Sequence, residues 1–243
     1  MIVEAHAKVN LTLEILGVRP DGYHDLRSVV VPIPLHDDVE ILTAPDGEIS
    51  TGAIDGVPPE SNLVVRAARV LAEATGCRLG ARIRVTKRIP MGAGLGGGSA
   101  DAAAVINGLN GVWNLNLPVE RLCEIGAAVG SDVPALVLGG PVLMEGRGER
   151  VSRIAPSALD ISVENLVLFV PPVFSSTAEV YREFRETDRG ICENDLQPAA
   201  CRLHPEIAAA LETLRGRGLS GIRMSGSGSA VFGFRVKTEE KLQ

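Results

Sequence analysis

The chain has 243 residues, of which 45% are hydrophobic and 22% charged, a composition typical of globular proteins with a buried core. Its formal net charge of −6 at pH 7 argues against nucleic-acid and membrane-surface partners, because both are bound through clustered Lys and Arg. Aromatic residues make up only 3% of the chain, too few for the stacking platforms that bind single-stranded nucleic acid.

The sequence shows neither a secretory signal nor an apolar run of about 18 residues, so we expect a cytoplasmic protein that does not enter a membrane. No CxxC spacing occurs among the cysteines, which we expect to be reduced. The histidines are scattered without an HExxH pattern, so no zinc site built by the protein is expected. These residues are Cys77, Cys123, Cys192 and Cys201, and His6, His24, His36 and His204.

The chain is expected to begin with β-structure. Residues 2–16 and 28–42 are rich in Val, Ile, Leu and Thr and are separated by the turn-bearing GVRPDGYHDL, which predicts two strands. Residues 62–75 place apolar side chains at helical spacing, with Ser61 or Asn62 as N-cap and Gly76 as stop. Residues 81–87 alternate between apolar and polar side chains, which predicts a half-buried strand.

A dense glycine cluster follows that strand. The stretch PMGAGLGGGSADAA, residues 90–103, holds five glycines between Gly92 and Gly98 and then favours helix, with Ser99 or Asp101 as a possible cap. So many glycines indicate a backbone that takes positive φ or lets a ligand approach closely. A strand, a glycine loop and a helix N-terminus together predict an anion site, most often for phosphate.

Three common phosphate motifs do not fit this loop. Gly92-x-Gly94-x-x-Gly97 matches the dinucleotide fingerprint in form, but the acidic residue expected about 20 positions later is only Glu120, at an apparent helix start. A Walker loop needs Lys before Ser99, and the HRD and DFG signatures of protein kinases do not occur.

The remaining elements predict an α+β protein. Residues 118–129 read as a helix, GSDVP follows at 130–134, and residues 141–154 look strand-like. We place a domain boundary near residues 155–160, which gives domains of 1–155 and 156–243. Mixed elements without strict βαβ alternation favour α+β over a doubly wound sheet. The second domain is expected to contain a strand at 166–170, helices at about 177–187 and 205–215, and a strand pair within 221–236.

Three motifs resemble those of the GHMP kinases, the family of galactokinase, homoserine kinase, mevalonate kinase and phosphomevalonate kinase. The glycine loop is similar to the ATP-binding motif of the family, AHAKVNLTL (5–13) to its N-terminal motif, and MSGSGSAVFG (224–233) to its C-terminal glycine motif. The resemblance implies a small-molecule kinase with ATP and Mg²⁺. It also implies the two-domain fold of the family, with a ribosomal-protein-S5-like N-terminal domain and a ferredoxin-like C-terminal domain.

The resemblance assigns residues to ATP. The glycine loop would cradle the phosphates, Ser99 would contact phosphate and Mg²⁺, and Lys87 and Asn62 would lie near the adenine. The loop residues concerned are Pro90, Gly92, Gly94, Leu95, Gly96, Gly97, Gly98 and Ser99.

The resemblance also assigns the catalytic and substrate residues. RPDGYHDLRSVV (19–30), Lys8 to Leu11 and GSDVP look most like the branch whose substrate is a cytidine diphosphate-linked polyol used in isoprenoid synthesis by the non-mevalonate route. By this resemblance Asp132 accepts the proton of the substrate hydroxyl and Lys8 holds both groups. Tyr23 would stack on the cytosine and His24 would bind its edge. Asn10, Thr177 and Tyr181 would complete the substrate site.

Taken without the family, several of these residues have ordinary structural readings. Asp132 before Pro134 is a common helix-capping pattern, and Lys8 could be a solvated surface lysine, although Asn10 two positions later lies on the same strand face. Tyr23 and His24 could decorate a turn. Tyr181 could belong to a helix core, and Ser225–Ser229 could form a hairpin that binds no ligand.

The sequence departs from the family pattern in two places. Where the N-terminal motif usually has Pro two residues before the lysine, this chain has His6. The chain ends at KTEEKLQ, where relatives continue, so the second domain is expected to be incomplete, with exposed apolar surface or an open sheet edge.

Other functions stay open at this point. A Rossmann-type oxidoreductase would bind NAD in place of ATP, and a catalytically silent binding module could share the kinase fold, although Lys8 and Asp132 are intact. Among kinases, a mevalonate or homoserine kinase is the alternative, in which Tyr23 and His24 would not matter. The oligomeric state is not determined by the sequence.

Overall fold

The computed structural model describes residues 1–45, 47–53, 62–159 and 161–236. Within these residues seven strands form one sheet around the long β3 (His24–Ala44), which pairs with β1 (Ile2–Asn10) and β2 (Glu14–Val18). The N-terminal region thus has three strands, not the predicted two. The chain leaves the ladder between β1 and β2 because the Leu13 N–H donates to the carbonyl of Glu193, far along the sequence.

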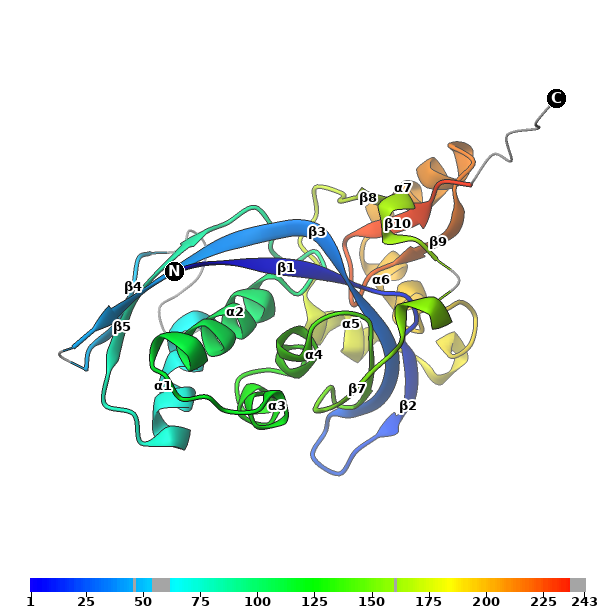
Figure 1. Cartoon of the computed structure of the whole chain (residues 1–243). Coiled ribbons are helices and arrows are strands. Elements are labelled where there is room, and N and C mark those ends of the chain that lie inside the picture. Colours follow the sequence, from blue (N-terminus) through cyan, green and yellow to red (C-terminus); the bar gives the residue numbers. More distant parts are fainter. Residues whose placement is uncertain (46, 54–61, 160, 237–243) are drawn as a thin grey trace.

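Four further strands complete this sheet. They are β4 (Ile49–Thr51), β5 (Gly80–Thr86), β6 (Val142–Gly146) and β7 (Arg150–Arg153), in the order β4-β5-β3-β6-β7. Below the sheet in Figure 1 lie α1 (Leu63–Thr75), α2 (Gly97–Val112), α3 (Val119–Ala127) and α4 (Val133–Leu138). The amphipathic helices and the sheet bury one core between them.

The ends of α1 agree with the sequence. Asn62 is the N-cap, and its side chain accepts from the Val64 N–H at 3.0 Å. Gly76 ends the helix in the left-handed region with φ 66°. The alternative cap, Ser61, lies outside the described residues.

A second sheet lies beside the first. It contains β8 (Leu166–Phe169), β9 (Ser220–Met224) and β10 (Val231–Phe234) in the antiparallel order β8-β10-β9, with α5 (Thr177–Glu183), α6 (Gln197–Leu203) and α7 (Pro205–Gly216) around it. The sequence did not predict α6. The helix expected at about 177–187 ends at Glu183 and is followed by a single 3₁₀ turn at Glu186–Asp188.

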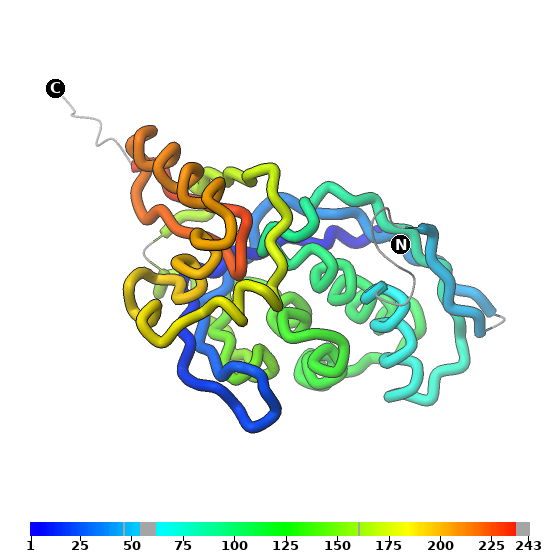
Figure 2. Tube along the Cα trace, turned by 180° about the vertical axis from the view of Figure 1, so that it is seen from behind, coloured from blue at the N-terminus to red at the C-terminus, as the bar shows by residue number. Residues whose placement is uncertain are grey.

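The two sheets share their hydrophobic cores. Phe232 and Phe234 of β10 belong to the same buried cluster as Val9 of β1 and Ile106 of α2. Figure 2 shows the second part of the chain, yellow to red, seated against the blue N-terminal strands. The α+β class is confirmed, with the architecture expected of the kinase family. The boundary near residue 155 stays a prediction, and residues 237–243, where we expect an incomplete end, lie outside the described residues.

None of the helices in the described part of the chain combines the length and the apolar character that a membrane span requires.

Candidate active site

The glycine loop is held in a conformation that few other residues could adopt. Gly92, Gly94 and Gly96 have φ values of 64°, 71° and 69°, in the left-handed region. A Cβ on Gly94 would lie 2.2 Å from the Ser225 carbonyl oxygen, which leaves no room for a side chain. At its two ends the loop is bounded by Pro90, which is exposed, and Leu95, whose side chain is buried in the core.

The loop leads directly into the N-terminus of α2. The N-cap is Gly96, which offers no side chain to the first-turn N–H groups. The prediction of Ser99 or Asp101 as the cap was therefore wrong: the left-handed Gly96 starts the helix earlier, so that Ser99 falls in its first turn. The N–H groups of Gly97, Gly98 and Ser99 have no partner within the helix, and with the helix dipole they provide a positive site for an anion.

The three sequence motifs meet at this loop. The Lys8 N–H donates to the Leu95 carbonyl oxygen at 3.0 Å. The Ser225 hydroxyl donates to the Gly94 carbonyl oxygen at 2.9 Å and accepts from the Asn10 N–H at 3.3 Å. The C-terminal glycine motif is thus the turn of the hairpin between β9 and β10 and lies against the loop, while its role toward a ligand stays a prediction.

Lys8 and Asp132 face each other beside the loop. The Lys8 Nζ lies 3.4 Å from the Asp132 Oδ2 and donates to the Asn10 Oδ1 at 2.7 Å. Its side chain is only 4% exposed, so the ammonium is a nearly buried charge with partners rather than a solvated surface lysine. Asn10 is fixed in turn by donating to the Ser28 hydroxyl at 2.8 Å.

Asp132 occupies the N-cap position of α4 but does not cap it. Its side chain makes no cap hydrogen bond and is 31% exposed, which leaves the carboxylate available to Lys8 and to a bound molecule. A Cβ on Gly96 would lie 3.1 Å from the Lys8 Cε and 3.7 Å from the Asp132 Oδ2. The glycine loop, the ammonium and the carboxylate therefore line one site.

Two of the predicted substrate residues, His24 and Tyr181, contact each other through their rings. The His24 and Tyr181 rings have their centroids 5.0 Å apart, and Phe184 meets His24 edge-on at 6.1 Å. Burial lowers the pKa of His24 below its usual 6.5, with opposing effects of Glu186 and Arg189, so its imidazole is neutral at pH 7. Burial raises the pKa of Tyr181, and the nearby charge of Asp132 raises it further.

Two other predicted substrate residues border this group. Tyr23 is 53% exposed, and the Arg147 guanidinium carbon lies 5.3 Å from the centroid of its ring. Thr177 begins α5, and its hydroxyl lies 2.8 Å from the Ser227 hydroxyl of the C-terminal glycine motif. Tyr23 therefore presents an open face, whereas Thr177 connects α5 to the C-terminal glycine motif.

Lys87 lies at the back of the glycine loop between two carboxylates. Its Nζ is 2.5 Å from the Asp37 Oδ2 and 2.7 Å from the Asp101 Oδ2. Burial raises the pKa of Asp101 to about 7, although Lys87 pulls it down. A Cβ on Gly97 would lie 3.4 Å from this ammonium, so Lys87 supports the start of α2.

Sequence reasoning missed Asp37, although a signal was present. Asp37 falls in the apolar register of β3 among Ile33, Val39 and Ile41, where a charge points to a buried partner. It is fully buried and accepts from the N–H groups of Arg88 and Ile89. Neither Lys87 nor Asn62, the cap of α1, is tested as an adenine contact, and both stay predictions.

Two family models match the chain. The model described as the N-terminal domain of GHMP kinases matches residues 62–140, and the model described as their C-terminal domain matches residues 176–241. A 4-diphosphocytidyl-2-C-methyl-D-erythritol kinase of Pelotomaculum thermopropionicum is 42% identical, over 98% of this chain and 90% of that protein.

Solved structures agree with these matches. A crystal structure of 4-(cytidine 5'-diphospho)-2C-methyl-D-erythritol kinase has a TM-score of 0.79 and 35% identity, covering 96% of this chain and 90% of that one. The mevalonate kinase of Methanococcus jannaschii has a TM-score of 0.69 at 16% identity, covering 99% and 92%, a likeness of fold alone.

Proposed function

The chain belongs to the GHMP kinase family, and from this we propose that it transfers the γ-phosphate of ATP to a hydroxyl of 4-diphosphocytidyl-2-C-methyl-D-erythritol. The observation that carries the proposal is the Lys8–Asp132 pair beside an uncapped helix N-terminus. A catalytically silent module has no need of a nearly buried lysine held against a carboxylate. We expect this reaction to take place in the cytoplasm.

The glycine loop and α2 supply the phosphate side of the reaction. Phosphoryl transfer asks the protein chiefly to position the groups and to stabilise the charge that spreads over the transferred phosphate. The first-turn N–H groups of α2 and the helix dipole do this without rearrangement at the moment of reaction. Gly94 and Gly96 carry no side chain, so the loop packs tightly against Ser225 and Lys8 and keeps one shape for the phosphates.

Lys8 and Asp132 act on the substrate hydroxyl group that accepts the phosphoryl group. The substrate hydroxyl oxygen attacks the γ-phosphorus, the bond from phosphorus to the ADP oxygen breaks, and the hydroxyl proton passes to the Asp132 carboxylate. A carboxylate is a weak base for an alcohol, so this transfer comes late, after most of the bond to ADP has broken. Lys8 stabilises the developing alkoxide and holds Asp132 in place.

His24, Tyr23 and Tyr181 supply the recognition of the base. A neutral imidazole both donates and accepts hydrogen bonds, which suits the edge of a cytosine. The open face of Tyr23 can stack on the same base. The substrates of mevalonate and homoserine kinases contain no nucleobase, so these residues would have no recognition role in such an enzyme.

The residues at the start of α2 also fit Mg²⁺. The Ser99 hydroxyl lies 3.9 Å from the position that a Cβ on Gly130 would take, so it is close to the turn that carries Asp132. The Ser99 hydroxyl and the Asp132 carboxylate offer the hard oxygen ligands that Mg²⁺ prefers. Ser99 would hold the ion, which would supply neutralisation of the phosphate charge.

The test is turnover of ATP to ADP by the purified chain with Mg²⁺, offering the cytidyl substrate, mevalonate and homoserine in parallel. We expect turnover with the cytidyl substrate alone. Asp132→Asn should lower kcat by ~10²–10⁴, the range for loss of a positioned base, with an unchanged fold by circular dichroism.

Turnover with another alcohol would keep the kinase chemistry and discard the roles of Tyr23 and His24. A loss of less than threefold in folded Asp132→Asn would remove Asp132 from the mechanism. Binding of ATP without turnover would favour the silent module.

A further inference from the structure

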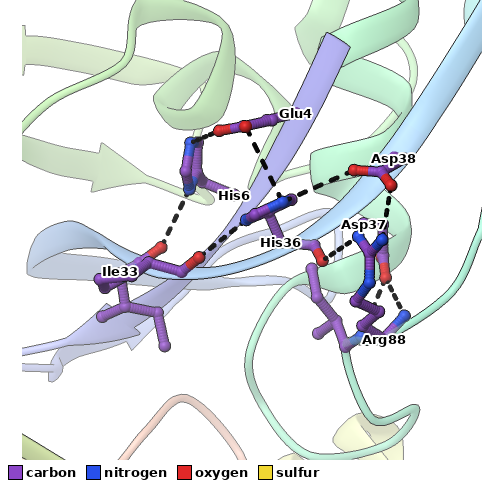
Figure 3. A network of polar contacts seen from close by, with 9 residues as sticks. Glu4, His6, Ile33, His36, Asp37, Asp38 and Arg88 are labelled. Carbon is purple, nitrogen blue, oxygen red and sulfur yellow. Dashed lines mark hydrogen bonds and ion pairs between the residues drawn. The ribbon is translucent and has the colours of Figure 1, made fainter. Parts of the chain in front are cut away.

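A second group of potential ligands lies on β1 and β3. The antiparallel pairing sets Glu4 opposite Asp38 and His6 opposite His36. Among the described residues, one ligand atom each of Glu4, His6 and His36 lies within 4.8 Å of the others. Figure 3 shows the Glu4 carboxylate between the two imidazoles, with Asp38 next to His36.

Hydrogen bonds to the backbone fix both histidine rings. The His6 Nδ1 lies 3.1 Å from the Ile33 carbonyl oxygen, and the His36 Nδ1 lies 2.9 Å from the Pro34 carbonyl oxygen. Because a carbonyl oxygen only accepts, each Nδ1 must carry a hydrogen. A neutral ring then has its lone pair on Nε2, and this is how metal-binding histidines are commonly oriented by a backbone carbonyl.

Both Nε2 atoms face carboxylate oxygens. The His6 Nε2 lies 3.2 Å from the Glu4 Oε2, and the His36 Nε2 lies 3.9 Å from the Glu4 Oε1 and 3.5 Å from the Asp38 Oδ1. Arg88 is 2.6 Å from the Asp38 Oδ2 and so occupies the other oxygen of that carboxylate. The lone pairs on the Nε2 atoms and on the carboxylate oxygens repel each other unless a positive charge lies between them. That charge is either a proton on each ring or a metal ion.

We propose that Glu4, His6 and His36 bind a divalent transition-metal ion of the Zn²⁺ type, with Asp38 or water as the fourth ligand. Two imidazoles and a carboxylate are the ligands of such ions, whereas Mg²⁺ and Ca²⁺ prefer oxygen ligands throughout. Tetrahedral Zn²⁺ with bonds of about 2.0–2.2 Å holds its ligand atoms about 3.3 Å apart.

The side chains are already close to that geometry. The distance of 3.2 Å from the His6 Nε2 to the Glu4 Oε2 fits as it stands, and the three ligand atoms, all within 4.8 Å of one another, need to approach by at most about 1.5 Å.

A metal ion here would join β1 to β3 next to the catalytic machinery. His6 is two residues from Lys8, and Asp37, which holds Lys87, stands between His36 and Asp38. Because the ion binds the folded chain, it would stabilise the pairing of these strands. The site is independent of the proposed kinase reaction and does not require it.

The test is isothermal titration calorimetry with ZnCl₂ on untagged, nucleotide-free protein. Wild-type protein should bind one equivalent, and His6→Gln and His36→Gln should each weaken binding at least tenfold, because each removes a ligand. His24→Gln is the matched control, which removes a histidine outside the cluster and should bind like wild type. Thermal unfolding without metal establishes that all four proteins are folded.

Two further readouts separate this site from the four free cysteines. The spectrum of bound Co²⁺ should lack thiolate charge-transfer bands, and Zn²⁺ should raise the Tm of the wild type but not of the His6 and His36 variants. Equal binding by His6→Gln, His36→Gln and His24→Gln would overturn the proposal. A thiolate spectrum would also overturn the proposal. So would the absence of Zn²⁺ binding, in which case protons on the two imidazole rings would supply the positive charge beside the carboxylates.

Discussion

At the scale of single residues, burial sets the charge of His24, which we propose faces the substrate. The His24 imidazole is packed between Tyr181 and Phe184, and this burial favours its neutral form. A neutral ring can accept a hydrogen bond from a base, whereas an imidazolium only donates. The proposed recognition of cytosine should therefore fail when His24 is protonated.

We predict an acid limb in the pH profile of kcat/KM that depends on His24. Because the pKa of His24 is lowered from 6.5, activity should stay constant down to that pH and fall below it. His24→Gln should raise KM for the cytidyl substrate and remove this limb, whereas His204→Gln should do neither. A limb with its midpoint above pH 6.5, or one kept in His24→Gln, would contradict the assignment.

A second prediction at this scale concerns Asp101. Here the stability of the fold, and not activity, depends on pH, and the loss comes as pH rises. Its pKa is raised from 3.8 to about 7, so the fold favours the protonated form, and its contribution to stability is lost as pH rises toward 7. Between pH 5 and pH 7.5 this loss is on the order of 2–3 kcal/mol.

Urea unfolding at the two pH values measures this loss. Wild type should lose more stability than Asp101→Asn, whose amide does not ionise. Asp21→Asn is the control: the backbone N–H of Tyr23 lowers the pKa of Asp21 below 3.8, so it does not titrate in this range. A pH dependence that is the same in wild type and Asp101→Asn would show that Asp101 is not the group responsible.

At the scale of elements, the glycine loop joins two distant parts of the chain. Its carbonyl groups accept from Lys8 of β1 and from Ser225 and Ala230 in the turn between β9 and β10. Its glycines are not equivalent, because Gly94 sits against the Ser225 carbonyl in the left-handed region, whereas Gly98 is an ordinary helix residue.

We predict that Gly94→Ala destabilises the protein by at least about 2 kcal/mol and raises KM for ATP. The left-handed backbone alone costs an alanine about 1–2 kcal/mol, and the Cβ would collide with Ser225. In Gly98→Ala the Cβ meets only Leu63 Cδ1 at 3.6 Å, so stability should be unchanged or rise by about 0.5–1 kcal/mol. Equal losses in both variants, measured by urea unfolding, would show that the loop geometry is not what matters.

At the scale of the whole molecule, one hydrophobic cluster crosses between the two sheets. Phe232 of β10 is fully buried, packs edge-on against Phe234 with centroids 5.8 Å apart, and shares its cluster with the core of the N-terminal sheet. The cluster also contains Trp113, the single tryptophan, which follows α2. We therefore expect the chain to unfold in one cooperative transition.

Phe232→Ala tests this coupling. The substitution should cost about 3–5 kcal/mol, and the fluorescence of Trp113 should report the lower midpoint although it lies in the other part of the chain. The midpoints by fluorescence and by far-ultraviolet circular dichroism should coincide. If only the circular dichroism midpoint moved, the two parts would unfold separately and the predicted boundary near residue 155 would mark independent units.

Local signals predicted most elements correctly. Asn62 and Gly76 gave the ends of α1, and the glycine cluster gave the strand, loop and helix around it, because caps, turns and periodicity act over a few residues. Local signals failed where contacts with a segment distant in the sequence determine the local structure. The break between β1 and β2 depends on Glu193, and the side chain of Asp132 leaves its capping position to face Lys8.

The sequence by itself determined the α+β class, the kinase motifs and the glycine loop for which phosphate binding is proposed. Only the tertiary structure decided that Asn10 meets Ser225, 215 residues away, and that Lys87 lies between Asp37 and Asp101. It also brought His6 opposite His36, where spacing along the chain predicted no zinc site. The physical reason is that hydrophobic periodicity fixes which face of an element is buried, but the register between strands and the packing of distant segments fix which polar groups meet.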